Sequence, residues 1–528
     1  MLITHRSDHG GLRQVIVLAV FLLMAGHAPG AVAIKVGQNI QGATLGADSG
    51  LVPPDADGAV GPNHYVQLVN GSFKVFSKTN GALVQSKSDI SFWTNAGIPL
   101  NGLTVSDPRV FYDPSVQRWF ASQIDVDENT IAGNDFLIAV SATTDPTGVW
   151  KAVSFPADTN GNFADFPTLG LDANGVYIAG NMFQPFPGGG FLGVEIVSLP
   201  KSDLLLASPT ATNRSYSGLL GGFTWGFALQ PTANFYSSNS VETVVAVTSD
   251  GTDFQPHNTL STFVISNAAS SNAVFAGLAN LIVPNYNVPI NPTQPGGINS
   301  LDDGDARINA SVYQAGNFIY AVHATQVGPR AAIRWYKLDA ASRTLLESGT
   351  ISDTNLEFFY PSIAANSNGL VVIGFNGCST NTLVSSFAAV GETVNGSTTF
   401  GSPVLLRTGG GTYQVIAGPA NRWGDYSATS LDPANVNTFW TIQEIPSSQD
   451  VWSVQITQIL IEPVLGLGIT NGNAVVSWDT NSAGFTLLSN TNLVTTNWTV
   501  VTPSPTVLGN QFVVTNSVSS NRFYRLVQ

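Results

Sequence analysis

Alternating hydrophobic and polar positions recur along most of the chain in short runs that turn residues separate. Each unit has an apolar run, a turn rich in Asp, Asn, Gly or Pro, and a second run with an aromatic or branched residue near its start. Such a unit predicts a β-hairpin, and we count seven copies, spaced by roughly sixty residues on average. The copies begin at Asp55, Asp107, Asp165, Thr224, Ala306, Tyr360 and Arg422.

Further apolar runs after most copies bring each repeat to about four strands. Examples are residues 136–142, 194–199, 262–265, 332–338 and 451–459. A lone four-stranded sheet cannot bury both faces, whereas sheets packed face to face around an axis can do so and leave few exposed edges. The pattern therefore predicts an all-β chain with a seven-bladed β-propeller over residues 34–462. Two stacked β-sandwiches are the alternative, but they need no motif repeated seven times.

Three other segments complete the predicted organisation. A strand from residues 34–50, added to the last sheet, would close the ring. Residues 267–302 are the longest irregular insertion, rich in proline and ending in acids, and are expected to lie over one end of the central channel. Residues 463–528 follow a Pro/Gly junction with short alternating strands, which predicts a small C-terminal β-sandwich.

The N-terminus has the features of an export signal. Arg6 and Arg13 precede an apolar run at 15–26, and Ala31-Val32-Ala33 fits a cleavage site, so residues 1–33 are expected to be removed. A membrane anchor is the alternative, although the run is short for a bilayer. We expect a secreted protein, extracellular, periplasmic or at the cell surface, with no transmembrane segment after signal removal. The single cysteine, Cys378, excludes an intramolecular disulfide.

Charge is scarce and mostly negative. Only 10% of residues are charged and the net charge is −14, with no basic stretch, so nucleic acid is disfavoured as a partner. In a chain this poor in charge, six of the seven hairpin copies nevertheless place a carboxylate just before the first strand, and three place an arginine there. If the seven hairpins are the innermost ones, these side chains share one rim of the channel. The candidate ligand-binding residues at this rim are Asp107, Arg109, Asp165, Trp225, Asp305, Arg307, Tyr360, Arg422, Asp425 and Tyr426.

Three interpretations of these rim residues stay open on the sequence. They could be structural, with Asp and Arg tying neighbouring strands together and Asp capping turns. They could bind a sugar or a carboxylate-bearing ligand through bidentate arginine contacts and aromatic stacking. They could also form a catalytic carboxylate pair of the kind that hydrolyses glycosides, but the sequence does not say which two acids lie close together.

Two loops carry alternating oxygen ligands that resemble calcium loops. They are "DTNGNFAD", with Asp158, Asn160 and Asn162, and "DVDEN", with Asp125 and Asp127. Neither has the full twelve-residue EF-hand pattern, and Asp/Asn turns without a metal are common. Calcium is the candidate ion here, and no other cofactor is expected.

Five stretches together resemble a family of secreted bacterial β-propellers, over roughly residues 51–460. They are "PPDADGAVGPNHYVQLVNG", "SDPRVFYDPSVQRWFAS", "DDGDARINASVYQAGNFIYAVHA", "YPSIAANSNGLVVIGF" and "RWGDYSATSLDP". The family has no settled activity and is grouped loosely with sialidase-like propellers, but this sequence lacks their S-x-D-x-G-x-x-W box, so no sialidase role is carried over. "GFTLLSNTNL…NWTVV…FYRL" resembles a C-terminal β-sandwich module of exported bacterial proteins, which implies attachment or packing.

The sequence thus predicts an exported propeller that recognises an extracellular glycan, another polymer or a protein ligand at the rim. A glycan-active hydrolase or lyase that uses rim carboxylates is one alternative, and a structural or adhesive surface protein is another.

Overall fold

The computed structural model of the chain describes residues 33–527, apart from 131, 186, 236–240, 250–254, 416–419, 471, 481–483, 510 and 518–520. Within these residues, strands form nine antiparallel sheets. Helices are few and short: α1 (Asp89–Ala96), α2 (Lys201–Leu204), α3 (Gly222–Trp225) and the 3-10 turn η1 (Pro295–Gly297). Apart from Ala33, the predicted signal segment 1–33 lies outside the described residues.

Seven of the sheets come from residues 33–462. Six of them contain four or five strands that follow one another along the chain, and the seventh combines three such strands with the first strand of the chain. The first comprises β2 (Asp57–Val60), β3 (His64–Val69), β4 (Ser72–Ser77) and β5 (Leu83–Lys87), and the second β6 (Thr104–Asp113), β7 (Arg118–Val126), β8 (Asp135–Ser141) and β9 (Trp150–Pro156). The third comprises β10 (Phe163–Leu171), β11 (Gly175–Phe183), β12 (Phe191–Pro200) and β13 (Ser215–Tyr216), and the fourth β14 (Phe227–Pro231), β15 (Val241–Val247), β16 (His257–Ser266) and β17 (Val274–Tyr286).

The fifth to seventh sheets continue the same order along the chain. The fifth comprises β18 (Tyr313–Ala315), β19 (Phe318–Val327), β20 (Arg330–Asp339) and β21 (Leu345–Ile351). The sixth comprises β22 (Glu357–Ala365), β23 (Leu370–Ser379), β24 (Thr382–Val394), β25 (Ser397–Phe400) and β26 (Val404–Arg407). The seventh comprises β27 (Ala428–Leu431), β28 (Thr438–Ser448), β29 (Val451–Glu462) and β1 (Ala33–Thr44).

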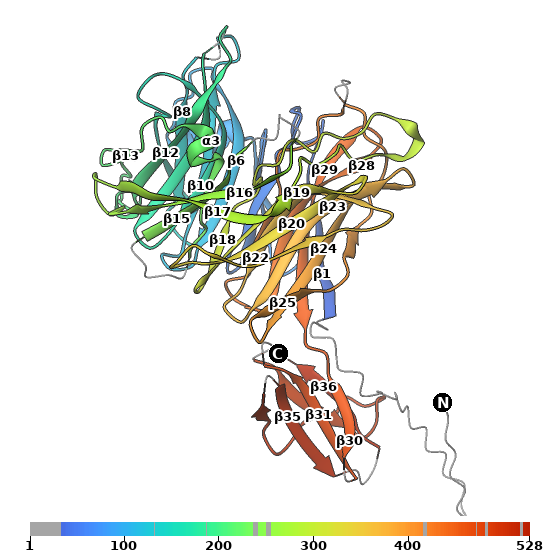
Figure 1. Ribbon diagram of the computed structural model, residues 1–528. Helices are drawn as coiled ribbons and strands as arrows, with labels where there is room; N and C mark the ends of the chain where they lie inside the picture. The colour runs from blue at the N-terminus through green and yellow to red at the C-terminus, as the bar shows by residue number, and fades with distance from the viewer. Residues whose placement is uncertain are drawn as a thin grey trace, which may run out of the picture.

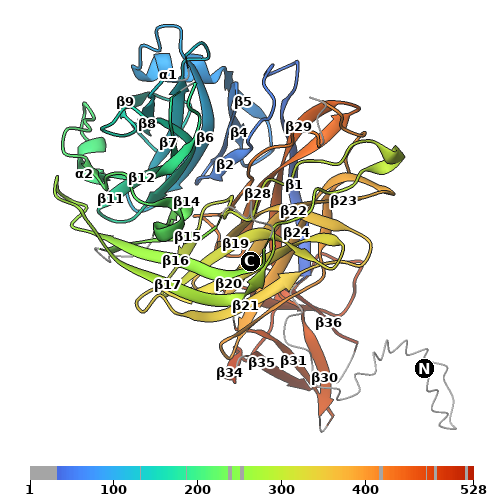
Figure 2. The same ribbon diagram turned by 45° about the horizontal axis from the view of Figure 1, so that its top comes forward.

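The first strands of the sheets contact one another in turn, so the sheets surround a common centre (Figures 1 and 2). β2 contacts β6, β6 contacts β10, β10 contacts β14, and β22 contacts β27, which contacts β2 again. An isolated bridge from Ala233 to Tyr313 links the fourth sheet to the fifth, and β18 and β19 contact β22. The predicted β-propeller-like fold with repeated sheets is therefore confirmed.

The N-terminal segment joins the last sheet, as the sequence predicted. β1 pairs antiparallel with β29, from Ala33 opposite Glu462 to Thr44 opposite Ser453. Sequence-distant ends of this part of the chain are thereby tied together by backbone hydrogen bonds, so the ring needs no other closure between its first and last sheets.

Local sequence explains the hairpins. At the end away from the rim, an Asp or Asn side chain accepts hydrogen bonds from N–H groups two to four residues on, which folds the chain back. These residues are Asp113, Asp172, Asn366 and Asp432. The aromatic residues near the starts of the second strands are all buried: Tyr65, Trp119, Tyr177, Tyr320 and Trp440.

The predicted irregular insertion at 267–302 is wrong in its first half. Residues 274–286 form β17, which pairs along β16 from Ser266 opposite Val274 to His257 opposite Tyr286. The strand has irregular register and many exposed positions, so its sequence lacks clean alternation. The second half does reach the rim, because Leu301 bridges to Asn421 and Asp302 N–H donates to the Asn421 carbonyl.

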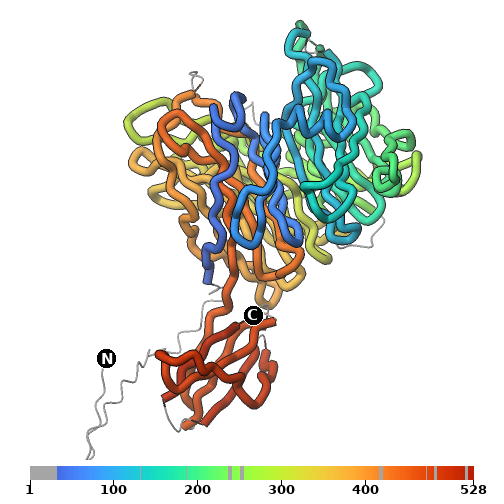
Figure 3. Tube along the Cα trace, turned by 180° about the vertical axis from the view of Figure 1, so that it is seen from behind, coloured from blue at the N-terminus to red at the C-terminus, as the bar shows by residue number. Residues whose placement is uncertain are grey.

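Residues 466–527 form two further sheets, drawn in red in Figures 1 and 3. One comprises β30 (Gly466–Thr470), β31 (Asn473–Asp479), β35 (Gln511–Ser517) and β34 (Thr506–Leu508), and the other β33 (Thr499–Val500), β32 (Thr486–Asn490) and β36 (Phe523–Val527). A core of their own lies between them, made by Val476, Trp478, Leu487, Val501 and Val514.

Candidate functional site

A backbone irregularity shapes the rim in four of the first strands. The pairing of the first strand with the second shifts register there, between Ser106 and Arg109 in β6 for example. The residue inside each shift has positive φ: Asp107 (58°), Phe166 (54°), Ala228 (54°) and Tyr360 (44°). Such bulges re-aim the side chains that follow, so they determine which rim residues face the centre of the ring.

Side chains of one sheet hold the irregular backbone of the next. The Asp107 N–H donates to Asn70 Oδ1 at 3.0 Å, and the Phe166 N–H donates to Asp107 Oδ2 at 3.1 Å. The Asp425 N–H donates in the same way to Asp55 Oδ1 at 2.8 Å. Asp107 therefore connects three consecutive sheets, and its carboxylate oxygens are occupied by the Phe166 N–H and the Ser106 hydroxyl.

Arg109 lies deeper in the protein than Asp107 and is 1% exposed. Its Nε donates to the Pro167 carbonyl at 3.1 Å and its Nη2 to the Asn309 carbonyl at 3.3 Å. The Arg109 guanidinium is 3.7 Å from Asp57 Oδ2 and lies 3.4 Å from the centre of the Tyr426 ring. One side chain on the second sheet thus contacts residues of the first and third sheets and of the loops before the fifth and seventh, which makes Arg109 the central contact of the ring.

The other two rim arginines remain partly exposed. Arg307 makes a forked contact with Asp305, with Nη2 2.7 Å from Oδ2, and stacks on Phe166 at 4.5 Å. Arg422 lies 2.5 Å from Asp425 and 3.6 Å from Asp302, and its side chain is 32% exposed. These pairs form the solvent-facing layer of the rim.

Burial raises the pKa of several rim carboxyls. Desolvation raises the pKa of Asp57 to about 7, although the Arg109 charge opposes the change. Desolvation and the charges of Asp165 and Asp425 raise the pKa of Asp107 to about 7. Burial also raises the pKa of Asp55, Asp303 and Glu444 well above the ordinary range. The described residues offer no hydrogen bond to the carboxylate oxygens of Glu444, which favours its protonated form.

The structure brings nine of the ten predicted rim residues together. The Asp165 carboxyl interacts electrostatically with Asp425, Arg307 and Arg422. The Tyr360 hydroxyl interacts in the same way with Asp425 and Arg422. Tyr426 covers Arg109 and donates its hydroxyl to the Pro108 carbonyl at 2.9 Å. Trp225 is the exception, because its ring packs edge-on against Phe263 at 5.1 Å, in the core of the fourth sheet.

Sequence reasoning missed several residues of the same region. Asp302 and Asp303 were seen only as acids ending an insertion, and Glu444 lies on a second strand, away from the rim motif. Phe166 and Asn309 were missed because they contribute a ring face and a backbone carbonyl to Arg109 and Arg307. Phe166 could have been predicted from the sequence, because "DFPT" occupies the same place in its repeat as "SDPR" does in the repeat before it.

The candidate calcium residues have internal partners. Asp158 Oδ1 accepts the N–H groups of Asn160 and Asn162, and Asp158 Oδ2 accepts the Asn162 side-chain amide. Asp125 Oδ1 accepts the Asp135 N–H, and Asp127 caps its own turn through Asn129 and Thr130. Among the described residues no group of three or more His, Cys, Asp or Glu side chains is placed to hold a metal ion. Calcium binding at either loop stays a prediction.

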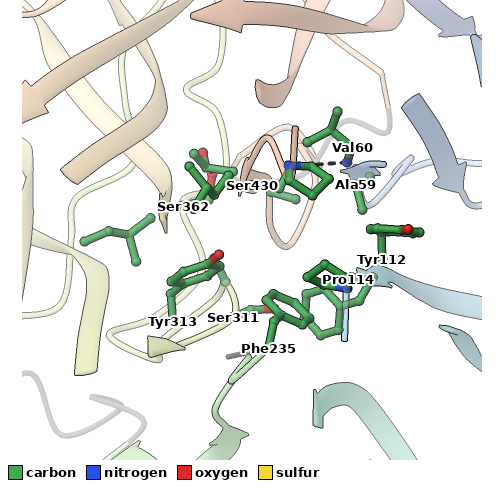
Figure 4. A pocket seen from close by; sticks show the side chains of 17 residues that line it. Ala59, Val60, Tyr112, Pro114, Phe235, Ser311, Tyr313, Ser362 and Ser430 are labelled. Atoms are coloured by element: carbon green, nitrogen blue, oxygen red, sulfur yellow. Dashed lines mark hydrogen bonds between the residues drawn. The ribbon is translucent and has the colours of Figure 1, made fainter. Parts of the chain in front are cut away.

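A cavity lies further along the first strands, beyond Arg109. Its interior and the open solvent at its mouth together contain about 540 Å³ of empty space. Figure 4 shows Phe235, Tyr313 and Pro114 on one side and Ser362 and Ser430 on the opposite side. This cavity could not be predicted from the sequence, because its lining is composed of ordinary strand and turn residues.

Comparisons with known proteins add little to this geometry. No family model matches the sequence, and no curated protein is similar to it. In the described part of the chain, no helix has the length and apolar character needed to cross a membrane.

Solved structures with a similar course of the chain have low identity and low TM-scores. A protein of unknown function from Dyadobacter fermentans is 13% identical, covers 68% of this chain and 95% of its own, and has a TM-score of 0.37. The Trypanosoma rangeli sialidase in complex with sialic acid is 11% identical over 74% of this chain and 59% of its own, at 0.34. TolB from Acinetobacter baumannii is 9% identical over 79% and 74%, at 0.29. We transfer no role from these proteins to any residue.

Proposed function

We propose that the protein is an exported seven-bladed β-propeller whose rim recognises a neutral extracellular glycan. The observation that carries the proposal is the division of the rim into two layers. Arg109 and Asp107 are buried in contacts between sheets, whereas the side chains of Arg307 and Arg422 are 20% and 32% exposed. The buried contacts hold the exposed side chains in place before a ligand binds, which lowers the entropic cost of binding.

The charge balance of the exposed layer favours an uncharged ligand. Asp302, Asp305 and Asp425 contribute three carboxylates, and Arg307 and Arg422 only two guanidinium groups. An anionic ligand would meet an excess of negative charge. A polyhydroxyl ligand can donate to the carboxylates and accept from the arginines at the same time, so a neutral sugar polymer suits the layer best.

The proposal predicts a separation of binding from stability at the exposed arginines. Arg422→Ala and Arg307→Ala should each weaken binding to a neutral polysaccharide about tenfold, the equivalent of ~1.4 kcal/mol. The cost in stability for Arg422→Ala should stay under about 1 kcal/mol because its pairs are partly solvated. A glycan array followed by calorimetry on the best ligand measures the first effect, and thermal melting measures the second.

Arg118→Ala is the matched control, since among the described residues Arg118 donates to the carbonyls of Val116 and Gln117, in the turn at the other end of β6. Binding that survives both rim substitutions would remove the rim as the site. Absence of binding to any glycan would leave the structural or adhesive interpretation in its place.

A glycan-active enzyme is the second candidate, and the raised pKa of Asp107 beside Asp165 is the observation that favours it. A carboxyl with a pKa near 7 can act as a general acid at neutral pH. Against this role, both oxygens of Asp107 already accept hydrogen bonds from Ser106 and Phe166. Release of reducing sugar from the same polysaccharides, lost in Asp165→Asn, would favour the enzyme.

We also propose that residues 463–528 form a separable β-sandwich module. In the described residues, β30–β36 pair only with one another and have their own apolar core. A chain that ends at Glu462 should therefore fold and melt within about 3 °C of the full-length propeller transition. Circular dichroism during heating checks this, and loss of the β-sheet signal in the shorter chain would show that the two parts depend on a shared core.

A further inference from the structure

The cavity beyond Arg109 is separate from the charged rim. Its lining includes Phe111, which follows Arg109 by two positions on β6, and Ala428, which follows Tyr426 by two positions at the start of β27. Pro114 and Pro433, from the Asp-Pro turns at the far end of the hairpins, also line it. The Arg109–Tyr426 stack therefore lies between the rim acids and this cavity.

The walls of the cavity are uncharged and of two kinds. One wall is aromatic: the Phe235 ring lies edge-on to Phe111 at 5.6 Å and to Tyr313 at 5.8 Å. The other wall is rich in hydroxyl groups, as Figure 4 shows for Ser362 and Ser430. None of the lining residues carries an ionisable acid or base other than tyrosine, so a charged ligand would be desolvated there without a counter-charge.

Most of the hydroxyl groups already have partners. Ser362 Oγ and Thr429 Oγ1 are 2.8 Å apart, and Thr429 Oγ1 donates to Thr441 Oγ1 at 3.0 Å. Ser430 Oγ accepts the Val60 N–H at 3.3 Å. A sugar brings several hydroxyl groups that each need a partner, so it would lose hydrogen bonds on entry, whereas a ligand with a single hydroxyl would lose few.

We propose that this cavity is a second binding site, for a small uncharged ligand with one aromatic ring and one hydroxyl group, as in a phenol. The ring packs among Phe111, Phe235 and Tyr313 in edge-to-face contact, and the hydroxyl group meets the serine-rich wall opposite. The site is independent of the rim and of the glycan proposal, since it shares no residue with either layer of the rim.

Phenol itself is the probe, with glucose and benzoate as the comparison compounds. Ligand-observed NMR titration of the full chain should show saturable phenol binding and no binding of glucose or benzoate at the same concentrations. Phe235→Ala removes the central ring of the aromatic wall and should weaken phenol binding about tenfold. Ser311→Leu fills the cavity from the side and should weaken it to a similar or greater extent.

Phe318→Ala is the matched control, because Phe318 is 37% exposed on β19 and does not line the cavity. It should leave phenol binding unchanged. Absence of saturable phenol binding to the wild-type chain overturns the proposal whatever the variants do, and so does competition of glucose with phenol. Circular dichroism of each variant shows whether a loss of binding comes with a loss of fold.

Discussion

Replacement of Arg109 by alanine is expected to destabilise the protein by roughly 4 kcal/mol, as removal of one partner of a buried charge pair does. Asp57, at 2% exposure, would lose the arginine paired with it, and the carbonyls of Pro167 and Asn309 would lose a donor. The Tyr426 ring would also lose the cation stacked 3.4 Å from its centre. All three losses act in the centre of the ring, where several sheets meet.

Thermal melting of four proteins tests this expectation: wild type, Arg109→Ala, Arg109→Lys and Arg422→Ala. The alanine variant should melt on the order of 10 °C lower than wild type. The lysine variant should fall in between, since a lysine keeps the charge but lacks the planar fork that reaches two carbonyls and stacks on a ring. Arg422→Ala should melt near wild type.

A double variant separates charge from packing. If an unpaired Asp57 causes most of the loss, adding Asp57→Asn to Arg109→Ala should recover part of the stability at pH 8. An Arg109→Ala protein that melts like Arg422→Ala would show that the guanidinium is solvated, contrary to its 1% exposure.

The different fates of Arg109 and Arg422 show where the sequence stops being informative. Both stand in similar motifs at the start of a predicted hairpin, so the sequence treats them alike. The two arginines differ in burial, because the bulge at Asp107 turns Arg109 inward, whereas Arg422 belongs to the loop that precedes β27. A positive φ at a non-glycine residue has no dependable signature, so burial of one arginine and exposure of the other could not be predicted.

Strands were predicted best where alternation and turn chemistry agreed. The hairpins at Asp113-Pro114 and Asp432-Pro433 have both signals, and both form. β17 was missed because its pairing with β16 is irregular and most of its side chains face solvent, so tertiary pairing rather than local pattern determines it. In the C-terminal sheets Trp478 is buried, whereas Trp498 is only half-buried and stacks with Arg525 at 4.3 Å.

Stability is expected to rise, not fall, when the pH is lowered from 8 to about 5.5. Burial raises the pKa of Asp57, Asp107 and Glu195 to about 7 and that of Asp125 to about 6. In the unfolded chain these groups titrate near their ordinary values of about 4, so between roughly pH 4 and 7 the folded state binds more protons than the unfolded state. The free energy of unfolding then decreases as pH rises through this window. Asp55, Glu242, Asp303 and Glu444, also with raised pKa, act in the same direction.

His323 opposes the trend between pH 8 and pH 5.5. Burial lowers the pKa of His323 to about 3, so below pH 6.5 the unfolded chain binds a proton there that the folded state does not. A single histidine is outnumbered by the carboxyls, so the balance should still favour the folded state at pH 5.5. Below about pH 4 the gain ends, because the carboxyls are then protonated in both states.

The measurement is the melting temperature at constant ionic strength from pH 8 to pH 5, for wild type and Glu444→Gln. Wild type should melt several degrees higher at pH 5.5 than at pH 8. Glu444→Gln is nearly isosteric and neutral at every pH, so it should raise the melting temperature at pH 8 and make the profile flatter. A wild-type melting temperature that falls steadily from pH 8 to pH 5.5 would contradict the prediction. It would mean that these carboxyls are ionised in the folded state and that groups outside the protein, such as water or a cation, stabilise their charge.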